Sequence, residues 1–215
     1  YIENQYLASN SITDALINRL KQPDGPEIVI VLPSSAESWL EQEVMDSARA
    51  DNLARLRNAD SRMRLAAYYP VNGAGDDIYV HAKVLVVDDR LIRVGSSNMS
   101  NRSMNLDSEC DLAIEAGPGD DATAQAIVEL RDSLVAEHLG MSREAFATQL
   151  ERHDHSLSRA IESIRTRIPN PTLHPLPVDE LNGGEEAIAR SDLLNPEEPS
   201  DSGKRVAQFL SQLGK

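Results

Sequence analysis

The chain has 215 residues and a formal net charge of −14 at pH 7. This length provides for one substantial core, or for one core with an appended piece, and a hydrophobic content of 40% suits a globular domain. No run of 18 apolar residues occurs, so the sequence predicts no membrane span, and any membrane contact is expected to be peripheral or to be made by a missing part of the protein. The acidic charge disfavours a nucleic-acid partner, whose phosphates need clustered Lys and Arg.

The first half of the chain predicts alternating helices and strands. Ser11 is expected to cap a helix that ends at Lys21, and residues 27–32 form an apolar run typical of a strand covered on both faces. Residues 37–58 show the apolar spacing of a long amphipathic helix. Further strands are expected over residues 64–69, 78–88, 91–95 and 109–115. This alternation predicts an α/β layered fold in which helices flank a mixed β-sheet.

The second half predicts helices followed by a Pro-rich tail. Gly117-Pro118-Gly119 marks a boundary, and helices are expected over residues 120–139, 142–152 and 156–167. Residues 168–203 predict an extended wrap or a flexible linker, with a short terminal helix over residues 203–213. We therefore expect three parts: a catalytic unit over residues 1–117, a helical extension over 118–167, and a Pro-rich acidic tail over 168–215.

One strand carries the side chains that could handle a phosphate ester. Side chains alternate along a strand, so His81 and Lys83 are expected to point the same way, roughly 6.5 Å apart. The residues between and around them are expected to point into a core: Val80, Ala82, Val84 and Val86. A hairpin around residues 88–90 then returns the chain toward His81, bringing Gly95, Ser96 and Asn98 near the imidazole and the ammonium.

This spacing, H-x-K-x4-D-x6-G-S-x-N, resembles the signature of the phospholipase D superfamily. Residues 1–6 are similar to the segment that leads into the second half of two-motif phospholipases D, and residues 101–109 are similar to the stretch after the second motif. The resemblance covers residues 1 to about 140. Only one motif is present, since no other histidine has a lysine two residues later. The resemblance implies the carboxyl-terminal half of a longer protein, or a processed or truncated chain.

The resemblance also implies roles for the motif residues. In the superfamily one motif histidine attacks phosphorus and the other protonates the leaving alcohol, and by this resemblance His81 is the general acid and base. Lys83 and Asn98 would hold the non-bridging phosphate oxygens. Ser96 is expected to form a cap or a hydrogen bond near the phosphate. Glu109 is the expected carboxylate that orients the imidazoles. The sequence alone does not fix which histidine is the nucleophile.

Three further expectations concern Asp88, Arg102 and metals. Asp88 belongs to the motif and is counted with the catalytic residues, although its opposite strand parity from His81 predicts a structural role in the turn. Arg102 either faces the phosphate or pairs with Asp107, and Asp107 is also the second choice for the orienting carboxylate. No His, Cys, Asp or Glu cluster has ligand spacing, so no metal and no other cofactor is expected.

The function implied by the resemblance is phosphodiester hydrolysis or phosphatidyl transfer on a phospholipid through a phosphohistidine intermediate. The second motif is expected from a missing amino-terminal half, or from a second copy of the chain in a symmetric homodimer. Two alternatives stay open. One is a phosphodiesterase or nuclease of the same superfamily, and the other is a catalytically silent half used for assembly or binding.

Overall fold

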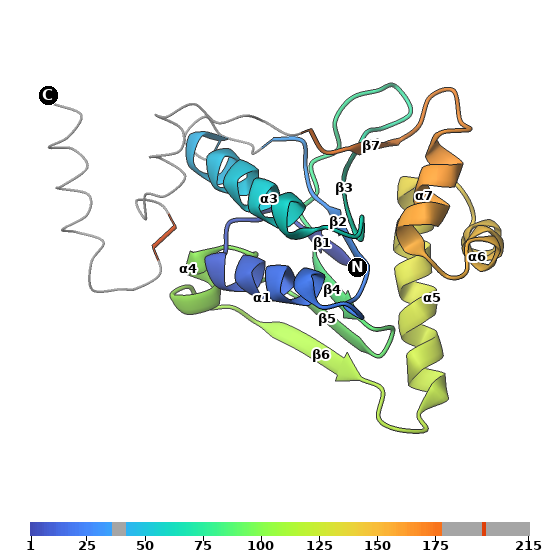
Figure 1. Cartoon of the computed structure of the whole chain (residues 1–215), viewed down its shortest axis with the longest axis horizontal. Coiled ribbons are helices and arrows are strands. Elements are labelled where there is room, and N and C mark those ends of the chain that lie inside the picture. The colour runs from blue at the N-terminus through green and yellow to red at the C-terminus, as the bar shows by residue number, and fades with distance from the viewer. Residues whose placement is uncertain (36–41, 178–194, 197–215) are drawn as a thin grey trace, which may run out of the picture.

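A seven-stranded mixed sheet forms the middle layer of the protein (Figure 1). The computed structural model describes residues 1–35, 42–177 and 195–196. The strands follow the order β6-β5-β4-β1-β2-β3-β7 across the sheet, in which β1, β2 and β3 are parallel and the other pairings are antiparallel. Their bounds are β1 (Ile2–Asn4), β2 (Ile28–Val31), β3 (Leu65–Pro70), β4 (Lys83–Val87), β5 (Leu91–Gly95), β6 (Asp111–Glu115) and β7 (Leu173–Pro175). The predicted α/β class with a mixed sheet is confirmed.

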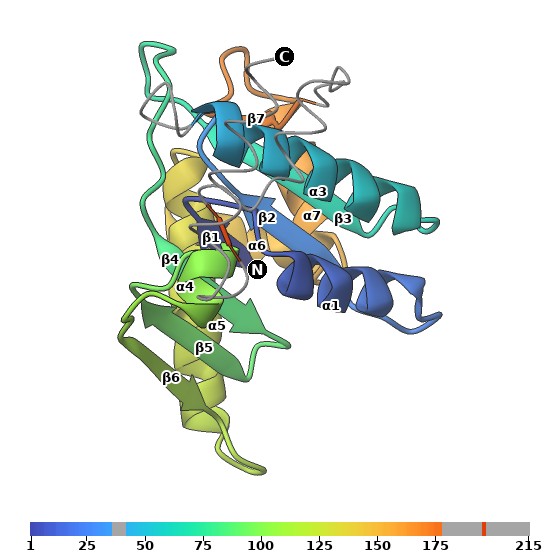
Figure 2. The ribbon, with the colours of Figure 1, turned by 90° about the vertical axis from the view of Figure 1, so that its left-hand side faces the viewer.

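Helices cover both faces of this sheet. Their bounds are α1 (Asn10–Lys21), the π-helical turn η1 (Gln42–Asp46), α3 (Ser47–Ala59), α4 (Asn101–Asn105), α5 (Asp121–His138), α6 (Arg143–Arg152) and α7 (Leu157–Arg165). Helices α1 and α3 lie on one face, and α5, α6 and α7 lie on the other (Figures 1 and 2). No helix in the described part of the chain is long and apolar enough to cross a bilayer.

Each face of the sheet buries its own hydrophobic cluster. Toward α5, α6 and α7, the buried Val80 and Val86 pack with Phe146 and Ile161, and Ala82 and Val84 pack against the same cluster. The expected inward direction of these four residues around the motif is therefore confirmed. The helical extension predicted over residues 118–167 covers this face of the sheet.

Several predicted boundaries need correction. The strand predicted over residues 78–88 begins only at Lys83, so His81 lies two residues before β4. The strand predicted over residues 109–115 begins at Asp111. The N-cap of α1 is Ser9, not Ser11, because the Ser9 side chain accepts a hydrogen bond from the Ile12 N–H.

Three short elements were not predicted, and two predictions fall partly or wholly outside the described residues. The three are β1, α4 and β7, and β7 lies in the segment predicted as an extended tail. The helix predicted over residues 37–58 consists of η1 and α3, with residues 36–41 outside the described part. The terminal helix predicted over residues 203–213 lies outside it entirely.

Candidate active site

The ammonium of Lys83 is buried where β1 and β4 meet. Asn4 and Lys83 are register partners in the antiparallel β1–β4 pair, so Gln5 follows directly beside the start of β4. The Lys83 Nζ donates to the side-chain oxygen of Gln5 at 3.0 Å and to the backbone carbonyl of His81 at 2.8 Å. An ammonium has three N–H donors, so these contacts within the described residues leave one donor for a ligand oxygen.

Gln5 also connects Lys83 to the aromatic ring beside His81. Its Nε2 donates to the hydroxyl of Tyr79 at 2.7 Å and to the hydroxyl of Tyr6 at 2.7 Å. The Tyr79 ring stacks on the imidazole of His81, with ring centroids 6.3 Å apart. His81 itself is exposed. Gln5 and Tyr79 are not among the site residues that the sequence predicts, although the resemblance includes residues 1–6.

Burial and one carboxylate act in opposite directions on the pKa of Lys83. Desolvation lowers the pKa of Lys83 from its ordinary value of 10.5, and the carboxylate of Glu109 opposes that change. An ammonium that is desolvated but still charged interacts more strongly with a ligand anion than one in bulk water does. Lys83 therefore suits the binding of a phosphate oxygen.

The turn after β5 holds Glu109 through Ser96. The Ser96 hydroxyl donates to Glu109 Oε2 at 2.5 Å and accepts from the Cys110 N–H at 2.9 Å. The Ser96 hydroxyl is therefore engaged with the Glu109 carboxylate. The expectation that Glu109 orients an imidazole stays a prediction. Gly95 permits this approach, because a Cβ there would lie 2.5 Å from the Cys110 carbonyl oxygen and would also collide with Asp111.

Ser97 and Asp111 form a second connection between the turn and β6. Ser97 is buried; its hydroxyl donates to Asp111, and its backbone N–H donates to the same carboxylate at 3.2 Å. Arg93 of β5 pairs with Asp111 at 2.8 Å. Burial acts to raise the pKa of Asp111, but the hydrogen bonds from Ser97 and Arg93 outweigh it and hold the pKa below its usual range. Sequence reasoning missed this connection.

Asn98 lies half-buried at the end of the same turn. Its side-chain oxygen is buried and has no hydrogen-bond partner among the described residues. The next residue, Met99, donates its N–H to the side chain of Asn4 at 3.0 Å, which holds the turn against β1. Rotating the Asn98 amide by half a turn would place Nδ2 where Oδ1 lies. Asn98 can therefore offer either a donor or an acceptor to a ligand.

The family model described as cardiolipin synthase, PLD-like domain, matches residues 1–132. The chain belongs to the phospholipase D superfamily.

Curated phospholipases D resemble short parts of this chain. A phospholipase D from Phytophthora infestans is 34% identical over 93 residues, which are 39% of this chain and 5% of that protein. Phospholipase D alpha 1 of Ricinus communis is 42% identical over 74 residues, which are 32% of this chain and 9% of that protein. Phospholipase D1 of Saccharomyces cerevisiae is 36% identical over 104 residues, or 42% of this chain and 6% of that protein. The chain thus spans less than a tenth of each of these relatives.

Solved structures show weaker likeness. A phosphatidylserine synthase from Haemophilus influenzae Rd KW20 gives a TM-score of 0.47 at 19% identity, covering 64% of this chain and 32% of that one. Nuc from Salmonella typhimurium, a phospholipase D family member, gives 0.39 at 17% identity, covering 60% and 72%. Both scores are low, so neither structure informs the site.

The structure separates one residue of the phospholipase D motif, Asp88, from His81 and Lys83. Asp88 lies at the opposite end of β4 from Lys83, roughly 16 Å away at ~3.3 Å per strand residue. Asp88 and Asp89 have φ of 51° and 56°, and the Arg90 N–H donates to the Val87 carbonyl at 3.0 Å, so the pair forms the tight turn of the hairpin. This placement fits the structural role predicted from parity and keeps Asp88 away from His81.

Arg102 is exposed and engaged with another side chain. Its guanidinium pairs with Asp107 at 2.7 Å, which is one of the two alternatives left open by the sequence. The pKa of Arg102 is raised by this hydrogen bond and charge pair. Within the described residues no group of three or more His, Cys, Asp or Glu side chains could hold a metal ion.

Proposed function

We propose that this chain supplies one half of a phospholipase D-type active site, which cleaves or exchanges a phosphodiester of a phospholipid. The observation that carries the proposal is the buried ammonium of Lys83, held between Gln5 and the backbone of His81 beside an exposed imidazole. Membership of the superfamily and similarity to curated phospholipases D support the reaction class. The acidic net charge favours a lipid over a nucleic acid as substrate.

The proposed reaction takes place in two displacements. One imidazole nitrogen attacks phosphorus, and the bond from phosphorus to the leaving alcohol breaks as the other imidazole gives that oxygen a proton. In the second displacement, the oxygen of water or of an acceptor alcohol attacks phosphorus and gives its proton to the second imidazole. The bond between phosphorus and the first imidazole nitrogen then breaks. His81 is assigned as the general acid and base, a role worth about 10²–10⁴ in rate.

The remaining residues act on charge and position. Negative charge grows on the non-bridging oxygens as the five-coordinate state forms. The N–H of Lys83 that has no acceptor among the described residues, together with the Asn98 amide, would hold those oxygens. Ser96 and Glu109 are positioning residues, since Ser96 fixes the carboxylate whose charge supports the protonated Lys83. Arg102 and Asp88 are left out of the proposed chemistry because of their positions.

The second motif comes from outside this chain in the proposal. An amino-terminal half of a longer protein would supply it, or a second copy of this chain related by a two-fold axis. The exposed position of His81 supports either arrangement, because its imidazole can face a partner surface.

Formation of phosphatidylethanol from phosphatidylcholine and ethanol tests the proposal. The chain is assayed alone at rising concentration, and again with an amino-terminal half of a two-motif relative. Product is expected in at least one arm, lost in His81→Asn, and kept in His155→Asn, which makes the same change at an exposed histidine on the α6–α7 turn.

Each contrary result has a distinct meaning. Product from His81→Asn would overturn the role of His81. No lipid product in either arm, with cleavage of single-stranded DNA by the same protein, would replace the lipid assignment by the nuclease alternative. No turnover of lipid or DNA would leave the silent half as the function.

A further inference from the structure

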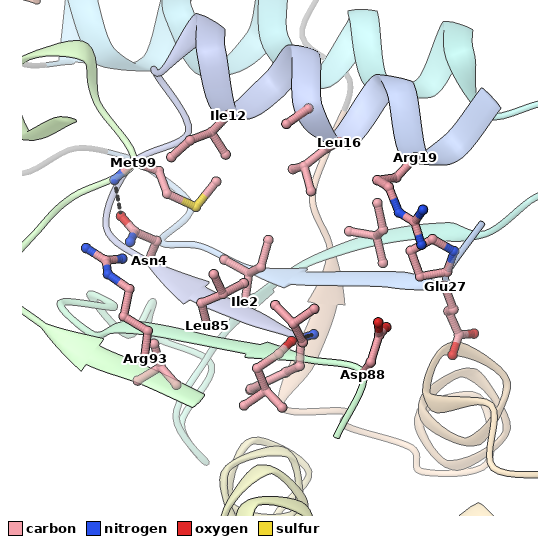
Figure 3. Close-up of a pocket in the computed structure, with 17 residues that line it drawn as sticks. Ile2, Asn4, Ile12, Leu16, Arg19, Glu27, Leu85, Asp88, Arg93 and Met99 are labelled. Atoms are coloured by element: carbon pink, nitrogen blue, oxygen red, sulfur yellow. Dashed lines mark hydrogen bonds between the residues drawn. The ribbon is translucent and has the colours of Figure 1, made fainter. Parts of the chain in front are cut away.

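A largely apolar cavity of about 400 Å³ lies between α1 and the sheet (Figure 3). This volume falls within the range of ligand pockets, about 300–1,000 Å³. Ile12 and Leu16 point into the cavity from α1, and Ile2 and Leu85 point into it from β1 and β4. Neither His81 nor Lys83 lines it, so the cavity is separate from the candidate active site described above.

One end of the cavity adjoins that site. Asn4 lines the cavity and is the register partner of Lys83, and Met99, which also lines it, directly follows Asn98. Alternation places Lys83 and Leu85 on the same face of β4, roughly 6.5 Å apart. The face of β4 that lines the cavity at Leu85 is therefore the face that carries the ammonium of Lys83.

The other end of the cavity lies beside the hairpin turn. Arg19, Glu27 and Asp88 line it there, and Figure 3 shows Asp88 and Glu27 at the end opposite Asn4 and Met99. Along the direction of β4, Asp88 lies roughly 16 Å from Lys83, at ~3.3 Å per strand residue. The cavity is thus elongated, with polar groups at its two ends and apolar side chains between them.

We propose that this cavity binds one hydrocarbon tail of an amphiphile whose phosphate lies at Lys83. The inference rests on the proposed function for the position of the phosphate, and it adds a binding site for the tail. The apolar side chains from the strands and from α1 cannot hydrogen-bond to a polar ligand. Transfer of a hydrocarbon from water into the cavity is favourable. Continuity with the Lys83 face determines where the tail enters, because a tail attached to that phosphate can run along β4 from Asn4 toward Asp88.

Binding of alkyl phosphates of increasing tail length, measured by calorimetry, tests the inference on the purified 215-residue chain. Affinity is expected to rise up to about four-fold per added methylene, the factor for full burial of a CH₂ group, until the cavity is full. Ala15→Phe adds a ring at a small, exposed residue that lines the cavity. That variant should stop the rise at a shorter tail.

Two further variants complete the comparison. Asn18→Phe makes the same addition on the exposed side of α1, away from the cavity, and should keep the wild-type dependence on tail length. Leu16→Ala enlarges the cavity and should move the plateau to longer tails. An unchanged plateau in both Ala15→Phe and Leu16→Ala would overturn the inference.

Lys83→Ala separates this inference from the proposed function. A dependence on tail length that survives Lys83→Ala but is shortened by Ala15→Phe supports the cavity, whatever happens to the phosphate site. Affinity that is independent of tail length, while inorganic phosphate still displaces the alkyl phosphates, would overturn the cavity and leave the phosphate site in place.

Discussion

Gln5 accepts a hydrogen bond from the ammonium of Lys83 at 3.0 Å, and this contact joins two residues that are 78 positions apart in the chain. The same side chain donates to Tyr79, whose ring stacks on His81. One amide therefore influences both motif side chains of the proposed reaction. Because a small displacement of an aligned group can cost a large factor in rate, Gln5 is expected to act as a positioning residue.

Gln5→Ala should lower kcat about 10–100-fold with a smaller change in KM, because Lys83 loses an acceptor and Tyr79 loses a donor. Gln5→Glu keeps the acceptor and adds a negative charge, which raises the pKa of Lys83 and should move the alkaline limb of the activity profile to higher pH. Initial rates over a pH series measure both effects. Gln125→Ala, at an exposed position on α5, is the control. An unshifted limb in an active Gln5→Glu enzyme would contradict the role of Gln5.

The lowered pKa of Lys83 predicts how stability changes with pH. In the folded state Lys83 loses its proton below its ordinary pKa of 10.5, so just below that pH the unfolded chain binds more protons. The free energy of unfolding contributed by this group must therefore rise with pH in that window. Wild type should gain stability relative to Lys83→Met as the pH rises toward 10.5. Denaturant midpoints measured over this range check the sign, and a flat difference would show that burial does not shift Lys83.

The motif could be recognised from the sequence because its residues are close together along the chain. Strand alternation correctly predicted that Val86 faces the core, and Val80, which lies before β4, is buried in the same cluster. Parity also indicated a structural place for Asp88, which the left-handed backbone of the turn explains. Local patterns of period two are enough for such predictions, because the two faces of a strand see different surroundings.

Local sequence patterns did not predict the contacts that complete the site. Gln5 reaches Lys83 only because β1 pairs with β4, and β1 has just three residues, too few to show a period. Ser97 hydrogen-bonds to Asp111 because β5 and β6 pair, although the motif includes Ser96 and not Ser97. Pairing between strands depends on the whole sheet, so a single segment does not reveal it.

Gly95→Ala should destabilise the protein by about 1–3 kcal/mol, as expected for an added group in a packed position. The new Cβ would collide with Asp111 and with the Cys110 backbone, neither of which can move without disturbing β6. Gly73→Ala is the matched control, since a Cβ there meets nothing within 4 Å. Chemical denaturation measures both variants. Equal denaturation midpoints for the two variants would mean that Gly95 does not lie as close to Cys110 and Asp111 as the structure shows.

Asp111→Asn should reduce stability at neutral pH and have little effect in acid. The hydrogen bonds from Ser97 and Arg93 favour the charged carboxylate in the folded state and lower its pKa against the opposing effect of burial. That contribution is fully present above the unfolded pKa near 3.8, and it is lost as the pH falls through the folded value. The cost should be about 1 kcal/mol above pH 5, because the pair is partly open to solvent.

Unfolding of wild type and Asp111→Asn between about pH 2 and 7 measures this difference. Glu115→Gln, which makes the same kind of change at an exposed carboxylate at the other end of β6, serves as the control. If Asp111 also fixes the turn that carries Asn98, the variant should bind inorganic phosphate more weakly at neutral pH. Unchanged phosphate binding in a destabilised Asp111→Asn protein would limit the Ser97–Asp111 connection to folding alone.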